Sequence, residues 1–394
     1  MRNKNIICFA TLHTYSNKER QQHIMEHMCN GGNKVVWVNP MGNINHSVLN
    51  IFKKLIKRKR QKDFVTNEEC EKIESENLIE KSIVILPIHN IKFFRIINSF
   101  LLNYQLKKIE KNFLDGKLDF IWTYYPSDVI NDYILLRKRK YECKVIYDNV
   151  QRLKGVEGLP KYVLKFEEEL YKLCDSIFCD SITIMNDVKQ LGINSIYRVP
   201  QGVNVEDFLI NDEEKDSIDY KKVEKEFRGF KRPIIGYIGG IHHSLDIDLI
   251  GYVADKCSDL DFVFVGPINI DITKLLKYKN LYFWGYRDYK YLKYYINQFD
   301  TCIIPYKVNE FTKGVYPTKM LEYVSMRKKI VSVDLPDIRD FEDYIFISRD
   351  YDEFAENLRT NSKKIIGAGI IRENTWESRF SRIEEVLEGQ LYEG

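Results

Sequence analysis

The residues best placed for chemistry stand in Tyr316–Tyr323, which reads YPTKMLEY. Pro317 is typical of a first helical turn, so Lys319 lies in that turn and Glu322, three residues on, shares its face. Free N–H groups at a helix start attract anions, and the Lys319 ammonium adds positive charge. The segment therefore suits a phosphate beside the paired hydroxyls of a ribose. A solvated Lys319–Glu322 pair on an amphipathic helix is the alternative.

A second group of candidates follows the strand expected at Pro233–Ile238. Gly239 and Gly240 would let the backbone approach a ligand closely, because glycine has no Cβ atom. His242 and His243 could donate hydrogen bonds to phosphate oxygens. The alternative is a tight strand-to-helix turn followed by two surface histidines.

These candidates need a scaffold, and the apolar pattern predicts one. Apolar runs of strand length alternate with helical patterns, which is typical of parallel sheets built from βαβ units. In the first half we predict strands at Asn5–Ala10, Lys34–Val38, Ile83–Leu86, Phe120–Thr123, Lys144–Tyr147, Ser176–Cys179 and Ser195–Val199. In the second half we predict strands at Pro233–Ile238, Asp261–Val265, Leu281–Phe283, Thr301–Ile304, Lys329–Val333 and Tyr344–Ile347.

The chain should divide into two Rossmann-like domains of the α/β class. Residues 211–231 are highly charged, and a new strand begins directly after them. The last segment has a helical period and lies beyond the last strand, so it could pack on either domain. We expect an N-terminal domain over 1–207, a linker over 208–231, a second domain over 232–373 and a C-terminal helix over 374–394.

Composition excludes several classes of protein. The 394 residues are 44% hydrophobic and 30% charged, with a net charge of +3, which is typical of a globular protein without nucleic-acid affinity. No apolar run reaches the roughly 20 residues of a membrane helix, and the N-terminus is expected to be a strand, not a signal peptide. Eight scattered cysteines without a CxxC pair indicate reduced thiols in a cytoplasmic protein and no metal cluster.

One segment of the first domain is strongly basic. Ile51–Lys62 reads IFKKLIKRKRQK and contains no acid, and a mixed apolar stretch follows at Ile91–Tyr104. Such segments suit an anionic membrane surface, so we expect a peripheral membrane contact that could deliver a lipid-linked acceptor. The alternative is a solvated basic loop and a buried core helix. The residues expected at the acceptor or membrane are Lys53, Lys54, Lys57 and Arg58.

The order of these motifs resembles that of GT-B glycosyltransferases. The segment from Asp300 to Ser332, with its PTKMLEY run, is similar to their donor site, and Val199–Phe208 is similar to the hinge that leaves their first domain. Within the fold, the chain resembles the transferases of teichuronic acid and capsule synthesis. Further matches are Ile235–Ile250, Phe264–Pro267, Asn280–Arg287, Arg20–Gln22 and Tyr147–Val150.

The resemblance implies two Rossmann-like domains with parallel sheets facing a central cleft. It implies that Lys319 faces the diphosphate of a nucleotide sugar, that Glu322 binds the ribose, and that Tyr286 and Arg287 frame the base. The first domain would receive the acceptor. The full set of expected donor-binding residues is Gly239, Gly240, His242, His243, Tyr286, Arg287, Tyr316, Thr318, Lys319 and Glu322.

The resemblance predicts a metal-independent transferase that moves a sugar from a nucleotide-diphosphate sugar, expected to be a UDP sugar, to a glycan or lipid-linked saccharide. The expected setting is bacterial surface polysaccharide synthesis at the inner face of the membrane, with no cofactor and no nucleic-acid partner. The alternatives are a sugar-nucleotide epimerase or sugar-phosphate synthase of the same fold, and a non-catalytic nucleotide-sugar-binding module.

Two departures from the family leave the stereochemistry open. Many retaining members carry a glutamate where this chain has Gly314, and Glu310 stands at another spacing. The usual Arg and Lys after the first strand of the second domain are also missing. An inverting reaction needs a general base, for which the candidates are Asp148, at the end of a strand, and His13, after strand one. Their alternatives are a turn cap and a loop residue.

Two carboxylate pairs are expected to be structural. Asp246 and Asp248 spell the DxD of metal-dependent transferases, but they fall at a predicted helix, where positions i and i+2 point apart. Glu167–Glu169 is expected to be a solvated face of the helix Lys161–Leu173.

Overall fold

The computed structural model describes residues 1–15, 18–41, 75–86, 88–89 and 91–389. The basic segment with Lys53, Lys54, Lys57 and Arg58 lies outside these residues. The chain forms two compact units. The first comprises Met1–Asp180, Ile184–Val199 and Phe380–Gly394, and the second comprises Ser181–Thr183 and Pro200–Arg379.

The first unit is built on a seven-stranded sheet in the order β3-β2-β1-β4-β5-β6-β7, with every pairing parallel. Apart from the edge strand β3, whose residues are half-buried or exposed, the strands are buried along most of their length, as expected where helices cover both faces. The strands are β1 (Asn5–Phe9), β2 (Lys34–Val38), β3 (Leu78–Lys81), β4 (Phe120–Thr123), β5 (Lys144–Asn149), β6 (Ser176–Cys179) and β7 (Ile196–Arg198).

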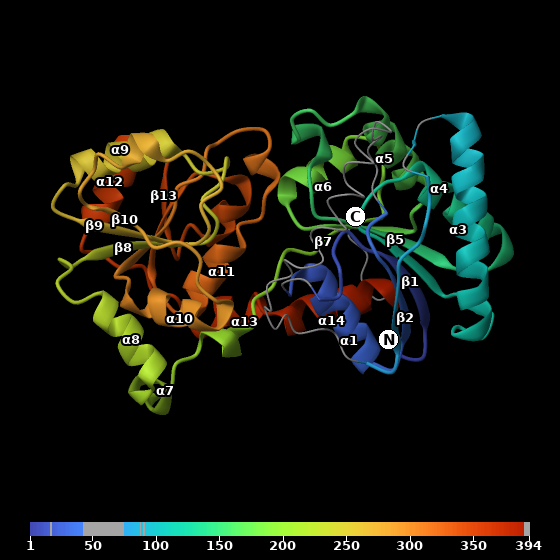
Figure 1. Cartoon of the computed structure of the whole chain (residues 1–394), viewed down its shortest axis with the longest axis horizontal. Coiled ribbons are helices and arrows are strands. Elements are labelled where there is room, and N and C mark those ends of the chain that lie inside the picture. The colour runs from blue at the N-terminus through green and yellow to red at the C-terminus, as the bar shows by residue number, and fades with distance from the viewer. Residues whose placement is uncertain (16–17, 42–74, 87, 90, 390–394) are drawn as a thin grey trace, which may run out of the picture. The chain divides into compact units, whose positions relative to one another are not determined.

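Two hydrophobic cores lie on the two faces of this sheet. One contains residues of α3, α4, α5 and α6, such as Leu102 and Leu170, and the other contains residues of α1 and the end of α14 (Trp376–Leu387), such as Ile24 and Ile383. Figure 1 shows these helices around the strands. The helices are α1 (Arg20–Asn30), α3 (Lys92–Asn112), α4 (Asp128–Lys140), α5 (Lys161–Leu173) and α6 (Ile182–Lys189).

The second unit has a six-stranded parallel sheet in the order β10-β9-β8-β11-β12-β13 around a single core. The strands are β8 (Ile234–Ile238), β9 (Asp261–Val265), β10 (Leu281–Phe283), β11 (Thr301–Ile304), β12 (Lys329–Val333) and β13 (Phe346–Ser348). The helices are α7 (Asp212–Asp216), α8 (Ile218–Glu226), α9 (Ile247–Lys256), α10 (Tyr289–Gln298), α11 (Thr318–Ser325), α12 (Tyr351–Arg359), α13 (Ala368–Glu373) and α14 (Trp376–Leu387).

The linker predicted over 208–231 differs from the structure. Residues 212–226 form α7 and α8, and Tyr220, Val223 and Phe227 belong to the core of the second unit. The high charge of this segment marks the outer helix faces and not a free connection. The chain instead passes between the units at Val199 and Pro200, and helix α14 begins in the second unit and ends in the first.

Two other predictions also need correction. The strand predicted at Ile83–Leu86 is absent from the described residues, and the edge strand is the more polar β3. Glu167 is buried and not solvated, because it accepts hydrogen bonds from the Tyr147 hydroxyl at 2.9 Å and the Asn149 amide at 3.4 Å. Among the described helices, none combines the length and the apolarity needed to cross a membrane.

Candidate functional site

The predicted donor residues of the loop after β8 and of the segment Tyr316–Glu322 follow β8 and β11, where the strand order of the second sheet reverses. Strand β8 comes first in this unit, β9 and β10 follow on one side of it, and β11, β12 and β13 lie on the other. In open α/β sheets, ligands bind beyond the carboxyl ends of the strands at such a reversal. Two backbone hydrogen bonds join the loops after β8 and β11, from Asp246 N to Pro305 O at 2.9 Å and from Lys307 N to Ser244 O at 2.8 Å.

Helix α11 brings its lysine to this point. The helix begins at Thr318, directly after Pro317, so Lys319 is in the first turn as predicted. Its side chain lies against Gly239, where a Cβ atom would be only 1.8 Å from Lys319 Cε. The ammonium is 5.9 Å from the centre of the Tyr237 ring. Gly239, with φ at +131°, therefore makes room for the lysine side chain rather than for a ligand alone.

The charged groups of Lys319 and Glu322 belong to half-buried side chains. Burial lowers the pKa of Lys319, but the neighbouring Tyr306 and Glu322 outweigh this effect, so the pKa lies above its usual value. Lys319 therefore carries its positive charge at neutral pH. Burial raises the pKa of Glu322, and the charge of Lys319 opposes that rise. A cation at a helix start suits a diphosphate. A carboxylate one turn further along can accept hydrogen bonds from the hydroxyls of a ribose.

The two histidines of the loop after β8 differ in exposure. His242 is half-buried, and burial, with Lys319 and His243 nearby, lowers its pKa, so the ring is neutral. Its Nδ1 accepts a hydrogen bond from Ser244 N at 3.3 Å, which leaves the proton on Nε2 as a donor. His243 is exposed and its ring centre lies 5.8 Å from that of Phe311.

Gly240 and Gly266 hold this loop in shape. The Tyr237 hydroxyl donates to Gly240 O at 3.2 Å. A Cβ atom on Gly266, where φ is +152°, would lie 2.1 Å from the carbonyl oxygen of Gly239. The glycine of the predicted Phe264–Pro267 motif is therefore needed for packing between two loops.

The two candidates in the loop after β10, Tyr286 and Arg287, have different surroundings. Tyr286 is about half exposed, at 49%. The Arg287 guanidinium is engaged within the protein, because Nε donates to the Tyr295 hydroxyl at 2.8 Å and Nη1 donates to Trp284 O at 2.6 Å. Arg287 also pairs with Glu226 at 3.5 Å. Arg287 thus holds the loop, and a base contact would fall to Tyr286 and the backbone.

The remaining donor candidates lie just before and inside the helix start. Tyr316 is buried and Thr318 is exposed. Gly314 is buried at the end of a short 3-10 turn, and Glu310 forms an ion pair with Lys313 at 3.0 Å. Asp246 caps α9 by accepting from Asp248 N and Leu249 N, which agrees with its predicted structural role.

Sequence reasoning missed two tyrosines of this site. Tyr306 contacts Lys319 and contributes to its raised pKa. The Tyr323 hydroxyl accepts a hydrogen bond from Ile238 N at 2.8 Å, so α11 is bonded to the last residue of β8. Tyr323 stands in the YPTKMLEY segment, but its partner lies 85 residues away in the chain. No local pattern could have indicated that contact.

The two candidate bases of the first unit have contrasting surroundings. Asp148 is completely buried and pairs with Arg20, whose Nε lies 3.0 and 3.1 Å from the two carboxylate oxygens and whose Nη2 lies 2.9 Å from Oδ1. Burial raises the pKa of Asp148, and Arg20 opposes this rise. A carboxylate held in this way is a structural partner of Arg20, and this geometry does not favour a role as general base.

His13 follows β1, and β1 lies between β2 and β4, where the strand order of the first sheet reverses. Its side chain is 40% exposed, and Nδ1 lies 3.7 Å from Glu80 Oε1. The other oxygen of Glu80 accepts a hydrogen bond from the buried Thr14 hydroxyl at 2.6 Å. The carboxylate of Glu80 is therefore anchored beside the imidazole, which sequence reasoning did not anticipate.

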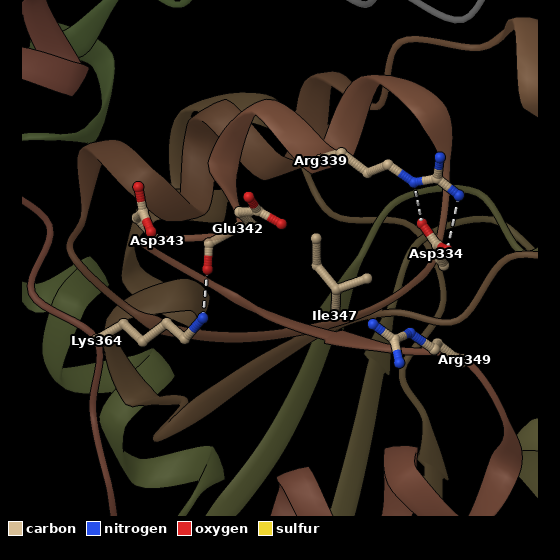
Figure 2. A pocket seen from close by; sticks show the side chains of 7 residues that line it. All are labelled: Asp334, Arg339, Glu342, Asp343, Ile347, Arg349 and Lys364. Carbon is tan, nitrogen blue, oxygen red and sulfur yellow. Dashed lines mark hydrogen bonds and ion pairs between the residues drawn. The ribbon is translucent and has the colours of Figure 1, made fainter.

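A hollow of about 360 Å³ lies elsewhere in the second unit, past β12. Figure 2 shows three cationic and three acidic side chains around it. Arg339 forms a two-bond pair with Asp334 at 2.7 and 2.8 Å, and Lys364 donates to the Glu342 carbonyl. Because its charges balance and these cations are engaged, this hollow is a weaker anion site than the start of α11.

The comparisons with known proteins agree with the predicted resemblance. No protein-family model matches the chain. A Bacillus subtilis (strain 168) protein named "Putative teichuronic acid biosynthesis glycosyltransferase TuaH" is 30% identical over 183 residues, which is 45% of this chain and 44% of that protein. The aligned part thus spans less than half of that relative.

Solved structures match over nearly the whole chain. Anabaena HepE in complex with UDP has a TM-score of 0.66 at 9% identity, covering 98% of this chain and 100% of that one. Sucrose-phosphate synthase from Thermosynechococcus elongatus has a TM-score of 0.70 at 12% identity, covering 98% and 99%. A glycosyltransferase from Rickettsia africae has a TM-score of 0.67 at 15% identity, covering all of both chains. The chain has the two-domain α/β GT-B fold, as predicted.

Proposed function

We propose that this protein is a glycosyltransferase that takes a sugar from a UDP sugar and passes it to a glycan or lipid-linked saccharide in bacterial surface polysaccharide synthesis. The observation that carries the proposal is the position of Lys319. Its charged side chain lies against Gly239 at the reversal of the second sheet, in the first turn of α11. The names of TuaH and of the UDP complex of HepE support the class of donor and the pathway.

The donor would be held by four parts of the second unit. The start of α11 and Lys319 would bind the diphosphate, with the Nε2–H of His242 as a further donor. Glu322 would accept hydrogen bonds from both ribose hydroxyls, and Tyr286 would contact the base. Lys319 would also stabilise the diphosphate as it leaves, so we retain metal independence as part of this proposal.

His13 is our candidate for the general base of an inverting reaction. Its imidazole would take the proton of the acceptor hydroxyl while that oxygen bonds to the anomeric carbon and the bond from that carbon to the diphosphate breaks. The electron pair of the broken bond leaves with the diphosphate. Glu80 would hold the ring and stabilise the imidazolium that forms, as a carboxylate beside a catalytic histidine does.

The donor assignment is tested by calorimetric titration of the protein with UDP and UDP-glucose. The wild type should bind UDP, and Glu322→Ala should weaken binding roughly tenfold or more, since losing hydrogen bonds of a charged acceptor costs about 1.5–3 kcal/mol each. Glu310→Ala is the matched control, because that carboxylate is exposed and paired with Lys313. Equal affinity of Glu322→Ala and the wild type would refute the ribose assignment.

Activity needs a separate measurement, because a binding module would pass the titration. Release of UDP from UDP sugars, followed with a lipid-linked saccharide as acceptor and in the presence of EDTA, measures transfer and its metal dependence. Binding without any turnover would favour the non-catalytic alternative. Turnover that stops with EDTA and returns with Mg²⁺ would contradict metal independence.

A further inference from the structure

Helix α3 of the first unit exposes an apolar stripe. Four of its side chains recur at helical spacing, and each is between 62% and 70% exposed. These residues are Phe93, Ile96, Phe100 and Tyr104. Phe100 and Tyr104 stack on each other with ring centres 6.3 Å apart. The opposite face of the same helix, with Leu102 and Leu106, supplies the core, so the stripe lies on the face of α3 that points away from this core.

The stripe becomes basic toward the end of the helix. Lys107 and Lys111 continue it at spacings of three and four residues, and Lys108 stands next to them. All three lysines are exposed. The acid of α3, Glu110, lies on the buried face and pairs with Arg137 at 2.6 Å. The outer face of α3 is therefore apolar at its start and positively charged at its end.

A hollow opens beside the basic half. Its volume is about 780 Å³, and it lies between the last turns of α3 and the segment that leaves β3. Lysine ammonium groups and apolar side chains both line it, a combination that fits a phosphate with an attached hydrocarbon chain. The lysines are Lys81, Lys107, Lys108 and Lys111, and the apolar residues include Ile79, Ile83, Ile109 and Phe113.

We infer that the outer face of α3 docks on an anionic phospholipid membrane. Aromatic and aliphatic side chains of such helices enter the boundary between headgroups and acyl chains, and lysines bind the negative surface. Tyrosine at the junction of the two halves suits the headgroup level. A protein partner fits less well, because the cores of protein interfaces are depleted in lysine. In Figure 1, α3 runs along the outside of α4 in its unit.

The test is flotation of the full-length protein with vesicles. Vesicles of phosphatidylcholine with about one third phosphatidylglycerol should carry the protein, and pure phosphatidylcholine should carry much less. The triple variant Lys107→Ser, Lys108→Ser, Lys111→Ser should bind the anionic vesicles roughly 100-fold more weakly, since each lysine near such a surface contributes about 1 kcal/mol. Phe93→Ser with Phe100→Ser should weaken binding to a similar degree with less dependence on salt.

Matched controls come from the second unit. Lys222→Ser with Lys225→Ser removes exposed lysines of α8, and Leu276→Ser removes an exposed leucine, so neither should change flotation. UDP affinity and circular dichroism verify that each variant is folded. Both α3 variants keep the basic segment with Lys53 and Arg58, so flotation equal to the wild type would overturn the proposal. Equal binding to neutral vesicles, or a dimer in sedimentation that the Phe93→Ser, Phe100→Ser variant dissolves, would also overturn it.

Discussion

The side chain of Lys319 lies across the α-carbon of Gly239, so that a Cβ atom there would be 1.8 Å from Lys319 Cε. The two residues are 80 positions apart and come from the loop after β8 and the first turn of α11. This contact fixes the direction of the ammonium. Gly239 therefore has a role without a functional group, because the absence of a Cβ atom leaves room for the side chain of Lys319.

Gly239→Ala should therefore displace the lysine and strain a backbone whose φ is +131°. We expect UDP affinity to fall about tenfold or more, because the cation for the diphosphate would leave its place. Calorimetric titration measures the change. Gly369→Ala is the matched control, since that glycine lies in α13 and a Cβ added there would have no atom within 4 Å. Unchanged affinity in Gly239→Ala would show that the lysine is free to relocate.

Asp148→Asn distinguishes a structural carboxylate from a base. The buried Arg20 would keep its charge and lose the charge of the Asp148 carboxylate, and breaking a buried ion pair typically costs about 3–5 kcal/mol of stability. Urea unfolding measures this loss. Asp115→Asn is the control, because its pair with Lys34 is largely exposed and should contribute little. A stable Asp148→Asn variant that binds UDP but has no turnover would instead support the role as base.

His13→Ala should lower kcat by about 10²–10⁴ if His13 is the general base, while UDP affinity remains as in the wild type. Glu80→Gln should lower kcat less than His13→Ala does, because the neutral amide no longer stabilises the imidazolium that forms during the reaction. Steady-state rates of UDP release with acceptor measure both. A His13→Ala enzyme with wild-type kcat would exclude this base.

Glu167 should make the stability of the protein depend on pH. Burial raises the pKa of Glu167 from 4.5 to about 7, against hydrogen bonds from Tyr147, Tyr171 and Asn149 that lower it. The folded state thus holds this proton more tightly than the unfolded state. The contribution is fully present below pH 4.5 and is lost as the pH rises to about 7, with a total of roughly 3 kcal/mol.

Glu167→Gln tests this dependence, because the amide is neutral at every pH and can still accept from Tyr147. Between pH 4.5 and 7, the free energy of unfolding of the variant should fall less steeply than that of the wild type. Glu168→Gln, at an exposed neighbouring position, is the control. Parallel stability curves for Glu167→Gln and the wild type would contradict the raised pKa.

The sequence by itself determined the class of the fold and the helix start that carries the candidate donor residue Lys319. Buried parallel strands are continuous apolar runs, so β2, β4, β9 and β11 were predicted at their observed bounds. A helix start is also local, since Pro317 and the residues after it define it, and Lys319 was placed correctly in the first turn. Signals of this kind are strong because each depends on neighbouring residues alone.

Only the tertiary structure decided which side chains meet. Arg20 and Asp148 are 128 residues apart, and their pairing, which no local pattern indicates, favours a structural role for a carboxylate that was predicted as a base. Arg287 is held by Tyr295 and Glu226, and the charged segment around Tyr220 packs into a core. Such contacts depend on how distant segments pack. A charge or a tyrosine looks the same in sequence whether it faces solvent, a ligand or another buried group.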